Sequence, residues 1–221
     1  MAAKNPARGR TFVLGMSGGS GAVYALRLLE VLLADGAAVQ LVVSGAGRRV
    51  LQHECGIDVD APGWGYEHLV PAPLRARLEV FDVAAVESTP ASGSAEIDGV
   101  VLCPCSMGTL ARVAHGFSTN LIERAGDVAL KEGRRLILVP RESPLSVIHL
   151  RNMLKLAEAG AVVLPAMPGF YHRPTEVQQL VDFVVARILD RLDVAHDLVA
   201  RWRTPESEAQ ALSPFHEGEE A

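Results

Sequence analysis

The sequence predicts an α/β protein with three layers, in which a doubly wound parallel sheet is covered by helices on both faces. Short, fully apolar runs such as GVVLC at 99–103 and RLILV at 135–139 are typical of strands buried on both sides. These runs alternate with segments whose apolar residues recur at helical spacing. The chain has 221 residues, of which 49% are hydrophobic, and is therefore long enough to bury one such core.

The first predicted unit is a strand, a turn and a helix within residues 11–30. The apolar run Thr11–Met16 precedes the turn Ser17-Gly18-Gly19-Ser20-Gly21, and from Ala22 the apolar residues return at helical spacing. This arrangement aims free backbone N–H groups and a positive helix end at an anion. The two serines add hydroxyl donors of the kind that a phosphate accepts. We therefore expect a phosphate-bearing ligand at this turn.

The turn chemistry narrows the class of ligand. Ser17 stands where the dinucleotide fingerprint G-x-G-x-x-G requires its second glycine, and no Gly-Lys-Ser/Thr follows, so the P-loop does not fit either. The second predicted strand, Ala38–Val43, ends at Ser44 rather than at the acidic residue that holds a dinucleotide ribose. These features favour a mononucleotide phosphate over NAD. The alternative is an ordinary strand–helix turn whose glycines serve packing alone.

The remaining elements continue the alternation. The prediction, in order, is a helix at 46–55, an irregular segment at 56–76, a strand at Leu78–Phe81, a loop at 90–94, a strand at 99–103, helices from Met107 and at 120–131, a strand at 135–139, a helix at 147–159, a strand at 161–164 and a helix at 175–192. Because no linker or repeat interrupts this pattern, we expect one domain at 11–195, between a flexible arm at 1–10 and a tail at 196–221.

Composition excludes several classes of function. A net charge of −5 does not suit nucleic-acid binding, and no apolar run reaches membrane-spanning length. The first ten residues lack the apolar region of a signal peptide, so we expect a cytoplasmic protein. Three cysteines imply no disulfide framework. The pair Cys103-Pro-Cys105 has no second pair of ligands beside it, so we expect no metal site.

Polar residues follow the carboxyl ends of the predicted strands, which is where ligands bind in sheets of this kind. Ser106 and Thr109 follow strand 99–103 at a helix start, where capping the helix and contacting a ligand are both open. Arg141 and Glu142 follow strand 135–139, where a surface ion pair is the simpler explanation. Glu54 lies near the end of a helix, where a carboxylate is unfavourable to the dipole, and this is a reason to expect a function.

Further charged residues have simple explanations when each is taken alone. Lys131 falls on the polar stripe of its helix with Asn120, Glu123, Arg124 and Asp127, which is usually a solvated face. Arg187 lies among apolar residues of the last helix, where its stem can cover apolar surface. Tyr171 fits a core aromatic.

Together, four blocks of the chain resemble the UbiX-type flavin prenyltransferases, once labelled 3-octaprenyl-4-hydroxybenzoate carboxy-lyases. The blocks are MSGGSGAVYALRLLE, LCPCSMGTLARVAHGFSTNLIERAGDVALKE, LILVPRESPLSVIHLRNMLKLAEAGAVVLPAMPGFYHRP and LVDFVVARILDRL. The resemblance runs from about Phe12 to Leu192. It implies a flavodoxin-like (Rossmann-like) homododecamer that binds FMN and alkylates reduced FMN at N5 and C6 with dimethylallyl phosphate, without a metal. The prenylated FMN then goes to a UbiD-type decarboxylase.

The resemblance also implies roles for individual residues. The positions that match cofactor-binding positions of the family are Gly18, Gly19, Ser20, Ser44, Ser106, Met107, Gly108, Thr109 and Arg141. The positions that match its prenyl-phosphate site are Lys131, Tyr171 and Arg187, with Arg141 beside them. The positions that match its reacting residues are Ser20, Glu54, Lys131 and Glu142. Two departures stand out: Gly19 replaces a more usual alanine, and Met107 a more usual threonine. Neither removes a backbone donor.

The expected chemistry suits these residue types. Cations and a phenol stabilise charge on a departing phosphate, and an allylic fragment needs an apolar, aromatic pocket. Ring closure requires a base, for which Glu142, Glu54 and the released phosphate are all open; we expect Glu142 to orient groups around N5 and phosphate to assist. Lys131 is expected to face a neighbouring subunit. The sequence leaves open a monophosphate or a pyrophosphate donor.

Two other functions compete. A flavin-dependent cysteine decarboxylase of the same superfamily carries a P-x-M-N-x-x-M-W-type loop and an active-site histidine, whereas this chain has PAMPGFYH there. A non-catalytic FMN carrier would need no cationic phosphate pocket, yet Lys131, Arg141 and Arg187 are present.

Overall fold

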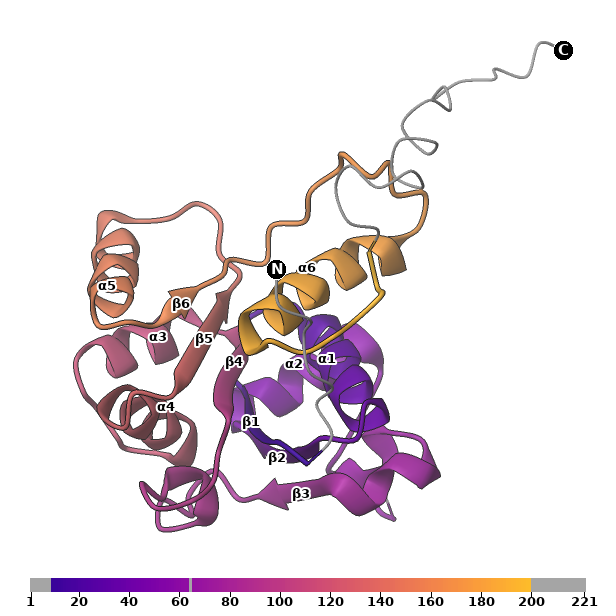
Figure 1. The fold of residues 1–221 in the computed structure, drawn as a ribbon, viewed down its shortest axis with the longest axis horizontal. Helices are drawn as coiled ribbons and strands as arrows, with labels where there is room; N and C mark the ends of the chain where they lie inside the picture. Colours follow the sequence, from indigo (N-terminus) through magenta and orange to yellow (C-terminus); the bar gives the residue numbers. More distant parts are fainter. Residues whose placement is uncertain (1–8, 64, 200–221) are drawn as a thin grey trace, which may run out of the picture.

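The computed structural model describes residues 9–63 and 65–199, which form one parallel sheet with helices on both faces (Figure 1). The strands are β1 (Thr11–Met16), β2 (Ala38–Val43), β3 (Leu78–Phe81), β4 (Gly99–Cys105), β5 (Arg135–Pro140) and β6 (Val162–Val163). All neighbouring pairs are parallel, in the order β3-β2-β1-β4-β5-β6. The predicted doubly wound parallel sheet is confirmed. The order reverses between β1 and β4, and this switch point is where such sheets bind ligands.

Two groups of helices cover the sheet. The α-helices are α1 (Ala22–Ala34), α2 (Gly45–Cys55), α3 (Met107–Ala114), α4 (Leu121–Lys131), α5 (Val147–Glu158) and α6 (Val177–Leu192). One core lies under α1, α2 and α6 and the other under α3, α4 and α5. Successive residues of a strand pack into opposite cores: Leu14 lies in the first core, whereas Val13 lies in the second. This alternation explains why the central strands β1, β2, β4 and β5 are largely apolar on both faces.

Most predicted boundaries lie within one or two residues of the observed ones, and three segments differ in a way that bears on the fold. The strand expected at 99–103 continues to Cys105, because pairing with β5 resumes after a register shift. The strand expected at 161–164 is only Val162–Val163. The segment expected to be irregular at 56–76 contains two 3₁₀ helices, η1 (Tyr66–Leu69) and η2 (Ala72–Arg77), and a third, η3 (Thr89–Ala91), lies in the turn-rich loop.

The two ends of the described chain are joined by hydrogen bonds. The Arg10 guanidinium donates to the backbone oxygens of Leu192 and Asp193, at 3.0 and 3.3 Å. His196, in the expected tail, contacts the Asp190 carboxylate at 3.1 Å. Arg10 therefore does not belong to a loose arm. The rest of the expected arm, 1–8, and of the expected tail, 200–221, lies outside the described residues. Within the described ranges, no helix is both long and apolar enough to cross a membrane.

Candidate functional site

The glycine turn after β1 lies between the starts of α2 and α3. A Cβ added to Gly18 would come within 2.6 Å of the Ala46 Cβ, and one added to Gly19 within 3.3 Å of the Ser106 nitrogen. Within the described chain, the backbone N–H groups of Gly18, Gly19 and Ser20 have no hydrogen-bond acceptor. Unpaired backbone donors beside two helix N-termini form an anion-binding concavity. The donor set therefore fits the phosphate of a mononucleotide such as FMN.

The N-terminus of α1 is not open to that anion. Gly21 is its N-cap and has no side chain, so the Glu54 carboxylate from α2 takes this place. Glu54 Oε2 accepts hydrogen bonds from the Gly21 and Ala22 nitrogens, each at 2.9 Å. A carboxylate of the chain therefore already occupies the two backbone donors at the start of α1, and the phosphate expected at the turn stays a prediction that rests on the donors of Gly18, Gly19 and Ser20. The free donors belong to the turn itself and to α2 and α3.

Glu54, Ser20 and Arg141 form one electrostatic group. Partial burial would raise the pKa of the Glu54 carboxyl, but hydrogen bonds from the Ser20 hydroxyl and from the backbone of Gly21 and Ala22, together with the charge of Arg141, lower it overall. Glu54 is therefore ionised at neutral pH. Its position near the C-terminus of α2, which sequence reasoning marked as unfavourable, is explained by this contact with the start of α1.

The serines of the site have separate tasks. Ser17 is buried: its hydroxyl donates to the Pro104 carbonyl at 3.0 Å and accepts from the Ser106 nitrogen at 2.7 Å, so it joins β1 to β4 and is not a ligand donor. Ser44 caps α2 by accepting from the Gly47 nitrogen, at 3.0 Å. Ser106 caps α3 by accepting from the Thr109 nitrogen, at 3.3 Å. The capping alternative for Ser106 is confirmed, whereas Thr109 lies inside the first turn of α3 and is not its cap. Contact of these residues with a ligand stays a prediction.

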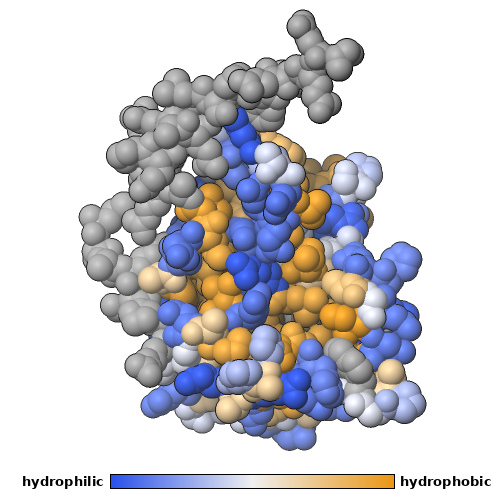
Figure 2. All heavy atoms as spheres, turned by 90° about the vertical axis from the view of Figure 1, so that its right-hand side faces the viewer, coloured by the Kyte–Doolittle hydropathy of each residue, from blue (hydrophilic) through white to orange (hydrophobic). Residues whose placement is uncertain are grey.

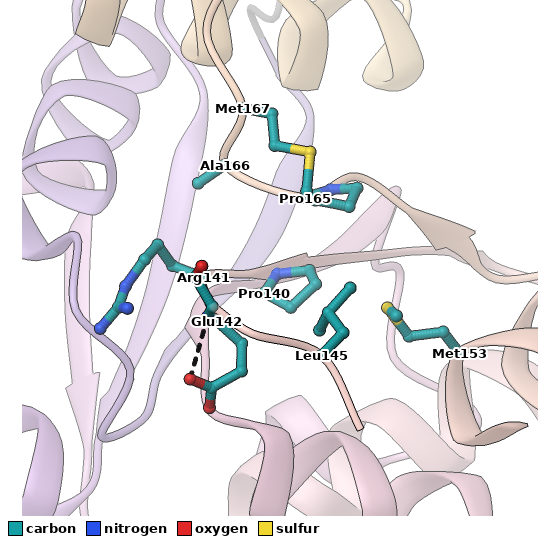
Figure 3. Close-up of a pocket in the computed structure, with 9 residues that line it drawn as sticks. Pro140, Arg141, Glu142, Leu145, Met153, Pro165, Ala166 and Met167 are labelled. Atoms are coloured by element: carbon teal, nitrogen blue, oxygen red, sulfur yellow. Dashed lines mark hydrogen bonds between the residues drawn. The ribbon is translucent and has the colours of Figure 1, made fainter. Parts of the chain in front are cut away.

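A cavity of about 280 Å³ lies at the carboxyl ends of β5 and β6 (Figure 3). Its lining residues are Pro140, Arg141, Glu142, Ser143, Leu145, Met153, Pro165, Ala166 and Met167. The lining is mostly apolar, without an aromatic side chain. In Figure 3 the Arg141 side chain extends away from Leu145 and Met153. Glu142 accepts from the Ser143 nitrogen at 3.1 Å. Arg141 and Glu142 therefore do not form the surface ion pair of the simpler explanation.

Tyr171 and Arg187 are brought together. The Arg187 guanidinium donates to the Tyr171 hydroxyl at 2.8 Å and lies over the Phe183 ring, 5.2 Å from its centroid. Phe183 in turn packs edge-on against Tyr171, with ring centroids 5.6 Å apart. Arg187 is about half exposed, so its cation keeps donors for an anion. The explanation that its stem merely covers apolar surface is incomplete.

Lys131 lies at the opposite end of the strands, near their amino ends. It ends α4, and β5 begins four residues later, so it lies near the amino end of β5 whereas Arg141 follows its carboxyl end. Its ammonium contacts Glu132 at 3.0 Å. The described chain thus separates Lys131 from Arg141 by a strand length, roughly 20 Å at the usual rise per residue.

The structure also reveals a pair that sequence reasoning missed. Glu123, expected on a solvated stripe, is fully buried, and its carboxylate accepts from Arg112 of α3. Burial would raise the pKa of Glu123, but hydrogen bonds from Thr119 and Arg112 lower it overall. The burial of Glu123 could not be predicted from the sequence of α4 alone, because its partner Arg112 belongs to another helix.

Among the described residues, no group of three or more His, Cys, Asp or Glu side chains is placed to hold a metal ion. All three cysteines are free thiols.

Comparisons with known proteins show the family of the chain. The family model described as Flavoprotein matches residues 1–189. A Pseudomonas aeruginosa protein named flavin prenyltransferase UbiX is 48% identical over 192 residues, which are 86% of this chain and 92% of that protein.

Two solved structures share the fold closely. One is AnUbiX (PadA1) in complex with FMN and dimethylallyl pyrophosphate: TM-score 0.77 and 37% identity, with 89% of this chain and 99% of that chain covered. The other is a dodecameric FMN-dependent UbiX-like decarboxylase from Escherichia coli O157:H7: TM-score 0.77 and 37% identity, with 88% of this chain and all of that chain covered.

Proposed function

The chain belongs to the UbiX family of flavin prenyltransferases, and we propose that it transfers a dimethylallyl group from dimethylallyl phosphate to N5 and C6 of reduced FMN. The N5–C bond forms as the C–O bond to phosphate breaks, the phosphate leaves with the electron pair, and N5 gives up its proton. Closure onto C6 then adds a proton to the double bond of the allyl group and removes one from C6, so this second step is proton-neutral overall. The observation that carries this proposal is the presence of two separate groups of donors. The turn between α2 and α3 suits the flavin phosphate, and the Tyr171–Arg187 pair suits a second phosphate.

The flavin would be held by the loops at the switch point. The backbone donors of Gly18, Gly19 and Ser20 lie next to the helix starts at Ser44 and Ser106, because Gly18 closely approaches Ala46 and Gly19 approaches the Ser106 nitrogen. Met107, Gly108 and Thr109 form the first turn of α3, where backbone N–H groups point out of the helix. Arg141 would contact the flavin from the end of β5.

The donor phosphate would be held by Arg187, Tyr171 and Arg141. A cation with a phenol beside it stabilises negative charge on a leaving phosphate. The cavity next to Glu142 combines apolar walls with charged residues at one end, which suits a five-carbon group joined to an anion. We propose that Ser20, Glu54 and Glu142 act near N5 and that the released phosphate assists the final deprotonation. Replacement of Glu142 by glutamine should lower turnover while FMN still binds; unchanged turnover would exclude this role.

Lys131 would reach a donor phosphate only from a neighbouring copy, because its own chain places it at the amino edge of the sheet. Helix α5 supports assembly of this kind. Val147, Ile148, Leu150 and Leu154 are at least half exposed on it, whereas Asn152 and Leu156 are its only buried residues. Burying the exposed half of four such side chains would contribute about 4 kcal/mol per copy.

A second face of the molecule is also partly apolar. The side with α1, at the right of Figure 1, is a mosaic of apolar and hydrophilic residues (Figure 2), whereas α5 lies on the left of Figure 1. Two separate apolar faces suit a closed assembly with more than one kind of contact. We propose a homo-oligomer, and a dodecamer like the related solved structure.

The assembly has a direct test. Sedimentation velocity should show that Leu154→Glu shifts the protein to smaller species, because a carboxylate cannot be buried in an apolar contact. Lys155→Glu introduces the same group at an exposed neighbouring position of the helix and serves as the matched control. An unchanged assembly of the Leu154 variant would exclude α5 as a contact.

The activity has an equally direct test. The purified protein is mixed with FMN, reduced without oxygen and supplied with dimethylallyl phosphate, and the released flavin is weighed by mass spectrometry. A gain of one five-carbon prenyl unit supports the proposal. Unmodified FMN, with the phosphate and also with the pyrophosphate as donor, would contradict it. We propose that the product serves a UbiD-type decarboxylase and, because the three cysteines are free thiols, that the protein is cytoplasmic.

A further inference from the structure

A hydrogen-bonded chain runs from the buried Glu123 to the first turn of α3. Glu123 accepts from the Asn120 side chain at 2.7 Å, from the Thr119 nitrogen at 3.0 Å, and from Arg112 Nε. These partners hold both carboxylate oxygens, so the Arg112 guanidinium has a fixed anchor. Arg112 itself is 45% exposed, and without this anchor it would sample many rotamers.

The anchored guanidinium reaches Thr109. Arg112 Nη2 lies 3.4 Å from Thr109 Oγ1, and the Ser106 hydroxyl donates to the same oxygen at 3.1 Å. A hydroxyl oxygen has two acceptor positions and one donor hydrogen. Arg112 and Ser106 fill both acceptor positions, so Thr109 can offer only its hydrogen to a further partner.

We infer that Arg112 is a positioning residue for the flavin. Held by Glu123, it fixes the Thr109 hydroxyl as a hydrogen-bond donor toward the bound flavin. The inference rests on the proposed contact between Thr109 and the flavin. It adds a residue of α3 and a residue of α4 to the site, although neither touches the flavin.

The variant that tests the inference must not leave Glu123 buried without a counter-charge, since that alone destabilises the fold. Arg112→Lys keeps a cation beside Glu123 but loses the planar fork that reaches Glu123 and Thr109 at once. The double variant R112M/E123Q removes both charges together, so it also removes the guanidinium contact with Thr109 without leaving a buried charge unpaired. Arg135→Lys is the matched control: Arg135 is also 45% exposed and ion-paired, with Asp193, but lies at the amino edge of the sheet.

The experiment measures the Kd of oxidised FMN by flavin fluorescence for the full-length protein, with the melting temperature of the flavin-free protein as the folding control. Arg112→Lys and R112M/E123Q should each weaken FMN binding about fivefold, the value of one typical hydrogen bond. Arg135→Lys should leave the Kd unchanged. In a Thr109→Val background, Arg112→Lys should have no further effect, because the hydroxyl that it positions is gone.

Each outcome has one meaning. If Thr109→Val leaves the Kd unchanged, the proposed flavin contact of Thr109 is wrong and the inference fails with it. If Thr109→Val weakens binding but neither Arg112 variant does, the inference fails while the proposed function stands. If Arg112→Lys weakens binding equally in both backgrounds, Arg112 acts on the site by another route and the inference is again overturned.

Discussion

Replacement of Glu54 separates the capping of α1 from the charge of the carboxylate. Glu54→Ala removes the acceptor of two backbone hydrogen bonds, from Gly21 and Ala22, at the start of a helix whose N-cap has no side chain of its own. Glu54→Gln keeps an oxygen that can accept both bonds and removes only the negative charge. The two variants should therefore differ in stability.

The magnitudes follow from the geometry. Loss of a helix cap costs about 1 kcal/mol, and the attraction of the carboxylate to the helix dipole adds about 0.5 kcal/mol at an exposed position such as this. For a domain of this size each kcal/mol shifts the melting temperature by about 2–4 °C. At pH 7 we expect Glu54→Ala to melt about 3–6 °C below the wild type and Glu54→Gln about 1–2 °C below it.

The pH dependence fixes the sign of the charge effect. Because the folded-state pKa of Glu54 lies below its ordinary value, the contribution of its charge is fully present above that ordinary value and is lost as the pH falls through the folded-state pKa. The gap between the wild type and Glu54→Gln should therefore close in acid, whereas part of the gap to Glu54→Ala should remain. Thermal melts followed by circular dichroism at equal protomer concentration measure both. This account of the cap would be refuted if both variants lowered the melting temperature equally. It would also be refuted if the difference in melting temperature between the wild type and Glu54→Gln did not change with pH.

Three further predictions concern the turn, the donor site and the thiols. Gly18→Ala should cost about 1–3 kcal/mol in thermal melts, since its Cβ would lie 2.6 Å from the Ala46 Cβ; wild-type stability would show that α2 can shift away. Arg187→Met should raise the KM for dimethylallyl phosphate about tenfold or more and leave the Kd of FMN unchanged, because a charged hydrogen bond contributes about 1.5–3 kcal/mol; a changed FMN Kd would place Arg187 in the flavin site instead. A thiol reagent should label Cys55 in the native protein but Cys105 only after unfolding, since burial raises the pKa of Cys105 to about 12; native labelling of Cys105 would contradict its burial.

Local signals were sufficient for the sheet and for most helix starts. All six strands were predicted; the central four are largely apolar because they are buried on both faces, whereas the outer strands β3 and β6 are short and only partly buried. Ser106 precedes a helix and caps it, as the sequence suggested, and Ser44 and Asn120 cap their helices in the same way. These outcomes depend on residues within one turn of each other, which is why the sequence alone contained them.

The site was predicted less completely, because its contacts join elements far apart in the chain. Ser17 looked like a phosphate donor, but β4 uses its hydroxyl. Glu123 looked solvated, but α3 supplies Arg112 across the helix pair. Lys131 matched a donor-site position by resemblance, yet its own chain holds it at the other edge of the sheet. For Ser17 and Glu123 the deciding partner lies on another element, and for Lys131 we propose that it lies on another copy. The periodicity of a single segment carries no information about such partners.

The capping of α1 by Glu54 explains how three helix starts can serve one small site. Three unpaired N-termini at the switch point would all attract the same anion, and none would fix its position. Glu54 neutralises one of them with a charge that belongs to the chain. In the proposed function, an incoming phosphate would thereby be directed to the turn at Gly18 and Gly19 and to the starts of α2 and α3. The same carboxylate, held between the Ser20 hydroxyl and the charge of Arg141, then remains next to the proposed flavin position. One residue can therefore select the anion position and supply a charge beside the reacting atoms.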